Sequence, residues 1–398
     1  MKKSGFGLRN TVLASMMAVL ASGVSAPAVM AAGDDPIKVV WLSFGISHEW
    51  FRSLSIFAQL EADKIAEEDG VTFEFIIKDG ARNIQTQLQQ VDDLIAQGDV
   101  DIIYFEPIDQ NAMRRAVEKI NKELDIPIGA AGITTNGGKY LYVGLDNVSA
   151  TKQVGDALVD ILNEKYGAGK WPANGKIIEI WGPAGISITD DRHAGFRLAA
   201  DPAVAANPGV EIVNGTGNWD PATAFKVSSD LIAKYGDEII AVYTHDDPSA
   251  TEGVVRALDL AGMQFPVGDP RHIPIVTYDA TKTGMEAVRN LEIDMITEQP
   301  AFGYAHLVMR YLYNWHKDGY DSLPKPGTVL STAELSEVFS EDSGVQFWSP
   351  VTVSAGPNWD GLWLAPKSPI VPYEVDPWEK NQWGNYMYFV DKGEFPQK

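Results

Sequence analysis

The stretch "IKVVWLSFGISHEWFRSL" at residues 37–54 contains one complete change from strand to helix. Its first half is a short apolar run that ends near Gly45, which is typical of a buried strand. From Phe51 onward an apolar residue recurs every three or four positions, which predicts an amphipathic helix. Between the two halves, His48 and Glu49 stand beside Trp50 and Phe51. A ligand pocket and a packed helix start both suit this mixture of titratable and aromatic side chains.

The same alternation continues along the chain. Strand-like runs such as "VTFEFIIKD", "VDIIYFEP", "GKIIEIWGP" and "EIIAVYTHDD" are followed by helical patterns, the last of them near residue 318. Such βα alternation predicts parallel sheets with helices on both faces. About a dozen strands are too many for one compact open sheet, so we expect an α/β fold with two doubly wound parallel-sheet lobes.

The N-terminus predicts export. Lys2, Lys3 and Arg9 precede the apolar run "TVLASMMAVLASGV", which is too short to span a membrane, and "VMA" at 29–31 offers a cleavage site. We therefore expect residues 1–32 to be a signal peptide and the mature protein to reside in the periplasm. The chain contains no cysteine, which excludes disulfides, thiolate metal sites and a lipid-anchored cysteine.

The charge balance is acidic, with a formal net charge of −22. Such a chain repels phosphate backbones and anionic lipid surfaces, so nucleic acid is not an expected partner.

The segment after about Ser322 has another character. It is rich in Pro and Gly and holds five of the eleven tryptophans, which argues against disorder. No helical period is found in it. We expect residues 336–398 to form an irregular extension that packs on the lobes. It would either cover them as a purely structural segment or shape one side of a cleft between them.

In open parallel sheets, ligands bind outside the carboxyl ends of the strands. The residues that follow the predicted strands are therefore candidates for a site. They are residues 47–51, 106–109, 131–133, 190–192, 219, 245–247, 278–279 and 298–299. Aromatic rings, carboxylates and one arginine dominate this set, and two facing lobes would line a cleft with them.

Eight local patterns, in order, resemble the periplasmic sugar-binding proteins of the ribose/galactose type. They are "SHEWFRSL", "FEPIDQNA", "GLDN", "GPAGISITDDRHAGF", "GNWD", "YTHDDPSATEGVVRALDLAG", "TYDATKTGMEAV" and "TEQPAFG". The resemblance covers about residues 36–333. It implies the type 1 periplasmic binding fold, in which two lobes are joined by a three-crossover hinge and close on ligand by hinge bending.

The resemblance also implies where the lobes divide. The crossovers would fall near Leu145, near Pro300 and at 322–326. The first lobe would then comprise residues 35–145 and 300–323, and the second lobe residues 146–299 and 324–335.

The resemblance carries a set of ligand-binding positions onto this chain. They are His48, Trp50, Phe51, Glu106, Arg192, Trp219, Asp246, Tyr278, Asp279, and either Glu298 or Gln299. Glu298 fits by its spacing to the following Pro, and Gln299 fits by residue type. Where the ribose-type proteins have an Asp-Arg clamp, this chain has Gly132 and Ile133, which puts a ribose-like ligand in doubt.

These residue types suit a sugar, because aromatic faces cover its C–H surface while carboxylates, amides and a guanidinium bind its hydroxyls. Competing structural roles stay open. Phe51 also lies on the core stripe of its helix, and Arg192 could instead bridge to Asp190 or Asp191. Asp246 and Asp279 could cap helices. Carboxylates beside aromatic rings would also hold a cation, which suits an amino sugar or amino-cyclitol.

We therefore expect a periplasmic solute-binding protein that captures a monosaccharide or polyol and delivers it to a membrane ABC permease. We expect it to be a monomer, to use no cofactor or metal and to catalyse no reaction. The alternatives are a sensor protein that presents a sugar-like signal to a membrane receptor kinase, and a carbohydrate hydrolase.

Overall fold

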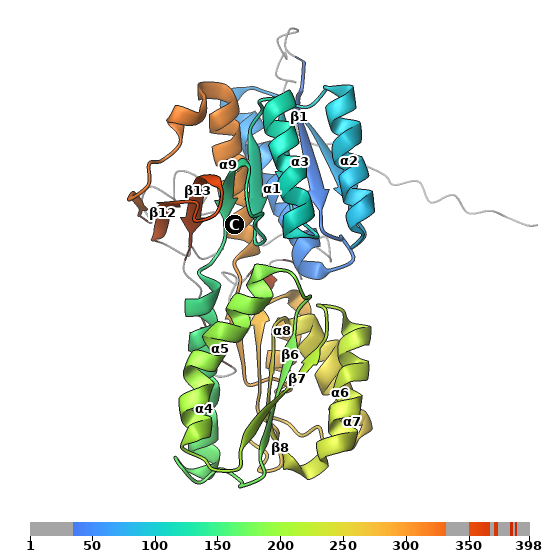
Figure 1. Cartoon of the computed structure of the whole chain (residues 1–398), viewed down its shortest axis with the longest axis vertical. Coiled ribbons are helices and arrows are strands. Elements are labelled where there is room, and N and C mark those ends of the chain that lie inside the picture. The colour runs from blue at the N-terminus through green and yellow to red at the C-terminus, as the bar shows by residue number, and fades with distance from the viewer. Residues whose placement is uncertain (1–34, 332–349, 367–369, 373–382, 385–386, 388–398) are drawn as a thin grey trace, which may run out of the picture. The chain divides into compact units, whose positions relative to one another are not determined.

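The structure, a computed structural model, describes residues 35–331, 350–366, 370–372, 383, 384 and 387. Its strands form an eight-stranded sheet in the order β11-β12-β13-β5-β4-β3-β1-β2 and a six-stranded sheet in the order β14-β10-β9-β8-β6-β7 (Figure 1). Helices pack on both faces of each sheet. The predicted α/β class with two doubly wound sheets is confirmed, and the expected signal peptide lies outside the described residues.

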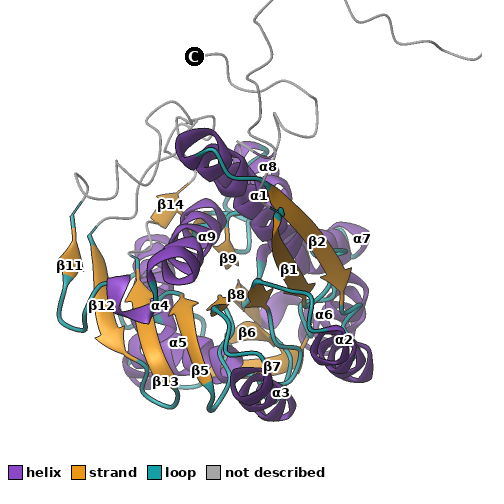
Figure 2. Ribbon diagram, turned by 90° about the horizontal axis from the view of Figure 1, so that it is seen from above, coloured by secondary structure: helices purple, strands orange, loops and turns teal. Residues whose placement is uncertain are grey.

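The first sheet takes strands from both ends of the described chain. Its strands are β1 (Ile37–Ser43), β2 (Phe73–Asp79), β3 (Ile102–Phe105), β4 (Ile128–Ala131), β5 (Lys139–Val143), β11 (Val329–Leu330), β12 (Val351–Ala355) and β13 (Asp360–Ala365). Helices α1 (Glu49–Asp69) and α9 (Ala301–Asp318) lie on one face, and α2 (Ile84–Gln97) and α3 (Gln110–Glu123) lie on the other (Figure 2). Alternate residues of β1 serve the two faces: Val39 and Trp41 pack toward α1 and α9, whereas Val40 and Leu42 pack toward α2 and α3.

The second sheet has the same layering. Its strands are β6 (Lys176–Trp181), β7 (Glu211–Thr216), β8 (Ile239–Thr244), β9 (Ile275–Asp279), β10 (Met295–Glu298) and β14 (Ile370–Pro372). Helices α4 (Asn147–Tyr166) and α5 (Ser187–Ala205) cover one face. The other face is covered by α6 (Pro221–Tyr235), the π-helical turn Ser249–Val255, α7 (Arg256–Leu260) and α8 (Lys282–Arg289). Two 3-10 turns, Gly236–Glu238 and Tyr320–Ser322, complete the described elements.

Helix α1 begins and ends at residues whose chemistry fixes its boundaries. The His48 ring accepts a hydrogen bond from the backbone N–H of Trp50, which satisfies one of the free donors of the first turn. Gly70 ends the helix in the left-handed conformation at φ 69°, which glycine adopts without a steric penalty. The capped first turn positions Trp50 and Phe51 at the carboxyl end of β1.

The C-terminal part corrects two expectations. Residues 324–335 were expected in the second lobe, but β11 pairs with β12 in the first sheet. The extension was expected to be irregular, but β12 and β13 form an antiparallel pair, and β13 joins β5 in parallel. The alternation in "VTVSA" explains this, because Val351 and Val353 are buried whereas Thr352 is exposed.

The third crossover is also later than the expected 322–326. Leu330 and β13, which ends at Ala365, still belong to the first sheet, and β14 at Ile370–Pro372 is the next strand and pairs with β10 of the second sheet. The first sheet thus gains three edge strands before the chain leaves it. The residues 332–349 lie outside the described part of the chain.

A buried charge cluster joins α1 to α9, and it yields a stability prediction. The fully buried Glu61 carboxylate accepts hydrogen bonds from His306 Nδ1 at 2.5 Å and Arg310 Nε at 2.6 Å. Glu61→Ala leaves Arg310 without its buried partner, so it should lower the free energy of unfolding by about 3 to 5 kcal/mol. Urea denaturation measures this loss.

Glu68 provides the matched control, because its carboxylate binds the same guanidinium at 2.7 Å from a more exposed position. Glu68→Ala should cost less than about 1 kcal/mol. Equal losses in the two variants would contradict the assignment of α1–α9 packing to the buried pair.

Candidate functional site

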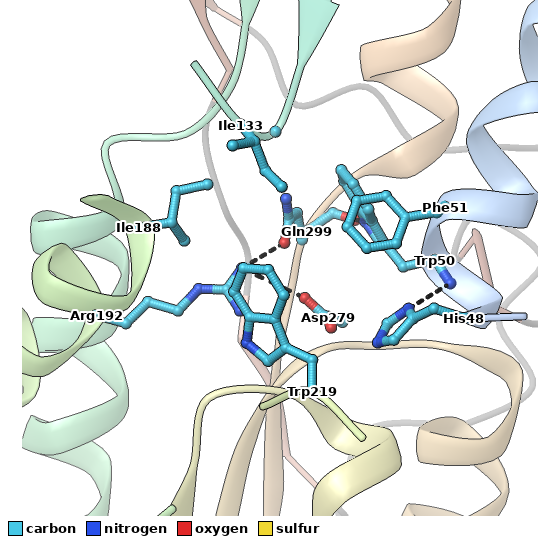
Figure 3. A pocket seen from close by; sticks show the side chains of 10 residues that line it. His48, Trp50, Phe51, Ile133, Ile188, Arg192, Trp219, Asp279 and Gln299 are labelled. Atoms are coloured by element: carbon cyan, nitrogen blue, oxygen red, sulfur yellow. Dashed lines mark hydrogen bonds and ion pairs between the residues drawn. The ribbon is translucent and has the colours of Figure 1, made fainter. Parts of the chain in front are cut away.

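A pocket lies where strands of both sheets end, with about 280 Å³ of space free of protein atoms, open solvent at its mouth included (Figure 3). It is lined by His48, Trp50, Phe51, Gly132, Ile133, Ile188, Arg192, Trp219, Asp279 and Gln299. The first five come from the ends of β1 and β4 in the first sheet, and the other five follow strands of the second. This is the carboxyl-end position at which open parallel sheets bind ligands.

Aromatic rings form one wall of the pocket. Phe51 stacks on Phe44 with centroids 4.7 Å apart and meets Trp50 edge to face at 5.2 Å. The Trp50 indole N–H donates to the Gln299 carbonyl at 3.3 Å. Phe51 is 3 % exposed within the core cluster and also lines the pocket, so its position is compatible with both of the roles left open by the sequence.

Two glycines make room for these rings. A Cβ on Gly132 would lie 2.4 Å from the Trp50 ring, and one on Gly182 would lie 2.4 Å from Trp219 Nε1. Trp219 itself has a positive φ of 53°. Arg82 holds this turn by donating from Nη2 to the Trp219 carbonyl at 2.6 Å.

Arg192 is buried at the centre of the polar side of the pocket. Its Nη2 donates to Gln299 Oε1 at 2.6 Å and to Asp279 Oδ1 at 3.5 Å, and its Nη1 donates to the His245 carbonyl. The guanidinium lies 3.8 Å above the centre of the Tyr278 ring, a cation–π contact. The proposed alternative, a bridge to Asp190 or Asp191, is absent among the hydrogen bonds and ion pairs of the described residues.

Asp279 is the one carboxylate among the described residues that line the pocket. Burial raises its pKa to about 6, although the Arg192 guanidinium opposes the shift. Its backbone has a φ of 104°, and its carbonyl accepts from the Trp383 indole N–H at 2.9 Å and from Gln299 N at 3.1 Å. The C-terminal extension thus holds the strained end of β9 in place.

Two lining residues, and Asp246 beside His48, each have a buried polar atom with no hydrogen-bond partner among the described residues. These atoms are His48 Nε2, Trp219 Nε1 and Asp246 Oδ1. His48 Nδ1 accepts from Trp50 N, and His48 Nε2 lies 3.8 Å from Asp246 Oδ2. A buried polar group without a partner costs about 1 to 3 kcal/mol, so these atoms indicate where ligand atoms would bind.

Four of the predicted residues lie outside the lining. Asp246 caps the following turn through Ser249 N at 3.1 Å, and Tyr278 packs beneath Arg192. Glu106 points away from the pocket: it accepts from Trp41, Ser43 and Phe44, and burial raises its pKa to about 8. Glu298 accepts from Trp383 N at 3.3 Å. Of the pair left open, Gln299 is the residue that lines the pocket.

Three residues at or beside the site are not among those predicted from the sequence. Asn147 Oδ1 accepts from Arg192 Nε at 3.4 Å and from the Tyr278 hydroxyl at 3.3 Å. Ile188 lies one helical turn before Arg192, a spacing that could have suggested a shared face. No local sequence pattern indicates Trp383, because its partner Asp279 is 104 residues away in the chain.

The described residues contain no cluster of three or more His, Cys, Asp or Glu side chains that could hold a metal. Among the described helices, none has both the length and the apolar composition needed to cross a membrane.

Two doubly wound sheets with a pocket at their strand ends define a ligand-binding protein of the type 1 periplasmic fold. A family model described as "periplasmic binding protein domain" matches residues 37–318. The chain therefore belongs to the periplasmic binding protein family, and the predicted family is confirmed.

Curated relatives include the ribose import binding proteins of Salmonella typhimurium (strain LT2) and Escherichia coli (strain K12). The first is 28 % identical over 277 residues and the second 28 % over 278, in each case 69 % of this chain and 83 % of the relative. Among solved structures, a galactofuranose binding protein superposes with a TM-score of 0.65 at 22 % identity, over 87 % of this chain and 99 % of that one. The arabinose transporter binding protein of Shewanella sp. ANA-3 gives 0.64 at 18 %, over 91 % and 100 %.

The raised pKa of Asp279 yields a pH prediction. The folded protein retains this proton up to about pH 6, whereas the unfolded chain releases it near pH 4. The protonated carboxyl thus favours folding below pH 4, and this contribution is lost as the pH rises from 4 to 6. Asp279→Asn removes the group, so from pH 4 to pH 7 the wild type should lose about 2 to 3 kcal/mol more stability than the variant. Urea denaturation at each pH measures the difference, and a constant difference would contradict the burial of this carboxyl.

Proposed function

We propose that this chain is a periplasmic solute-binding protein that captures a monosaccharide or polyol in the pocket and delivers it to a membrane ABC importer. The observation that carries the proposal is the pairing of an aromatic wall, Trp50, Phe51 and Trp219, with the buried Arg192–Asp279–Gln299 cluster. A sugar ring needs both, because its C–H face is apolar and its rim carries hydroxyls.

The chemistry of the pocket favours binding over catalysis. Glycoside hydrolysis uses a pair of carboxyl groups that flank the scissile bond, and Asp279 is the one carboxylate among the described lining residues. Its Oδ1 faces the Arg192 guanidinium at 3.5 Å, an arrangement that orients hydroxyl groups. Loading of a transporter, without turnover of the sugar, is the function consistent with this site.

The lining also bears on the ligand. Gly132 and Ile133 present an apolar surface where the ribose-type pattern has charged residues. Most polar contacts would come from Arg192, Asp279 and Gln299, with the unpartnered nitrogen atoms of His48 and Trp219 as further polar groups. We propose a neutral sugar or polyol that turns an apolar part of its ring toward Gly132 and Ile133. We also propose that the N-terminal 32 residues are a signal peptide that directs export, and that the protein is a monomer.

Removal of the Trp219 ring tests the aromatic wall. D-ribose, L-arabinose, D-allose and myo-inositol serve as probes in a thermal-shift screen, because a ligand that binds only the folded state raises Tm. For the best probe, Trp219→Ala should weaken the calorimetric affinity more than tenfold without unfolding the protein. Trp315→Ala removes a partly buried ring outside the lining and should leave the affinity unchanged. An unchanged Kd for Trp219→Ala would refute its role.

Substitution of Arg192 tests the polar side. Arg192→Ala should abolish most binding of the same probe, and Arg192→Lys should weaken it at least tenfold, because an ammonium cannot make forked contacts to two hydroxyls. The Lys variant retains a buried positive charge beside Asp279, so its fold is the better preserved of the two. Near-wild-type affinity in a folded Arg192→Lys protein would assign the residue a structural role instead.

A further inference from the structure

A second pocket adjoins the first, with about 830 Å³ of space free of protein atoms, open solvent at its mouth included. It lies between the end of β5, the first turns of α4 and α5, and the turn that joins β12 to β13. The two pockets share Ile188. The extension that the sequence left unexplained therefore builds one wall of a new cavity.

The two pockets are separated by side chains whose polar groups are already hydrogen-bonded within the protein. The Tyr142 hydroxyl donates to the Gly132 carbonyl at 2.9 Å, and Asn147 Oδ1 accepts from Arg192 and Tyr278. Asn147 Nδ2 donates to the Leu145 carbonyl at 3.3 Å. Because these groups are occupied by protein partners, an occupant of the second pocket would not displace one from the first.

Three aromatic rings line the second pocket in fixed orientations. Trp359 stacks on Tyr140 at 5.2 Å and meets Tyr142 edge to face at 5.5 Å. Trp363 is held by a hydrogen bond from its indole N–H to the Gly144 carbonyl at 2.8 Å. The Trp359 indole N–H is buried and has no partner among the described residues. Such rings offer both an apolar face for a sugar ring and a π surface for a cation.

The charge of this pocket is negative. Asp146 and Asp191 are its charged lining residues, and the described lining contains no Lys or Arg. Asp146 uses its carboxylate to cap α4 through Ser149. The half-buried Asp191 carboxylate accepts no hydrogen bond from the described residues. Burial and the carboxylates of Asp190 and Asp146 raise its pKa, and Arg192 opposes the shift only in part.

We propose that this pocket is a second binding site, which takes a hydroxylated ring carrying an ammonium group, such as an amino sugar or amino-cyclitol. The ammonium pairs with Asp191, and the ring packs against Trp359 and Trp363. The acidic chain, with a formal net charge of −22, favours the approach of such cations. This site does not depend on the sugar proposed for the first pocket, because the two share only Ile188 among their lining residues.

The test measures D-glucosamine, D-galactosamine and 2-deoxystreptamine by calorimetry, each against its N-acetylated, uncharged form. At least one amine should bind more than tenfold tighter than its acetylated form. Asp191→Asn should weaken that amine at least tenfold. Asp190→Asn is the matched control, since this neighbour is exposed and outside the pocket, and it should leave the Kd within twofold.

A second variant and a cross-check separate this site from the first. Trp359→Ala should also weaken the amine about tenfold, which keeps the test valid if Asp191→Asn misfolds. Arg192→Lys should weaken the neutral sugar probe and retain amine binding. The proposal is overturned if none of the three amines binds, if both pocket variants bind as the wild type does, or if Arg192→Lys loses the amine together with the neutral sugar.

Discussion

The buried guanidinium of Arg192 is the constraint on which the rest of the site depends. A charge taken out of water requires partners on every side, and here they come from four parts of the chain. The His245 carbonyl lies after β8, Asp279 ends β9, Gln299 follows β10, and Asn147 begins α4. These contacts hold the helix that carries Arg192 against the strand ends around it. The same groups form the polar side of the pocket.

The C-terminal extension supports the same region through Trp383. The Trp383 ring is fully buried, and its indole N–H binds the Asp279 carbonyl while its ring lies 6.5 Å from Phe57 of α1. Gly384 allows this approach, because a Cβ there would lie 2.4 Å from the Ala280 carbonyl. Further upstream, β12 and β13 widen the first sheet, and the turn between them forms one side of the second pocket. The extension is therefore part of the architecture of both pockets.

The sequence predicted the architecture where its signals are periodic and local. The alternation of apolar strands and amphipathic helices predicted two sheets with helices on both faces, though not the strands β11 to β14 at their edges. The strand-end rule led to Trp50, Trp219 and Arg192, which the structure brings to one pocket. Glu106 shows the limit of that rule. A residue at a strand end can point to either side of the sheet, and this one binds Trp41 and Ser43 in the interior. After residue 318 the regular alternation of strand and helix stops, and the contact of Trp383 with Asp279 joins residues 104 positions apart, so the structure of the extension was not predicted.

The most direct test of the account is a crystal structure of the protein with the neutral sugar or polyol that gives the largest thermal shift. One sugar or polyol ring should lie in the first pocket, in contact with Trp50 or Trp219, with hydroxyls within about 3.2 Å of Arg192 and Asp279. Ligand density elsewhere on the protein, or an empty first pocket at saturating ligand, would contradict this expectation.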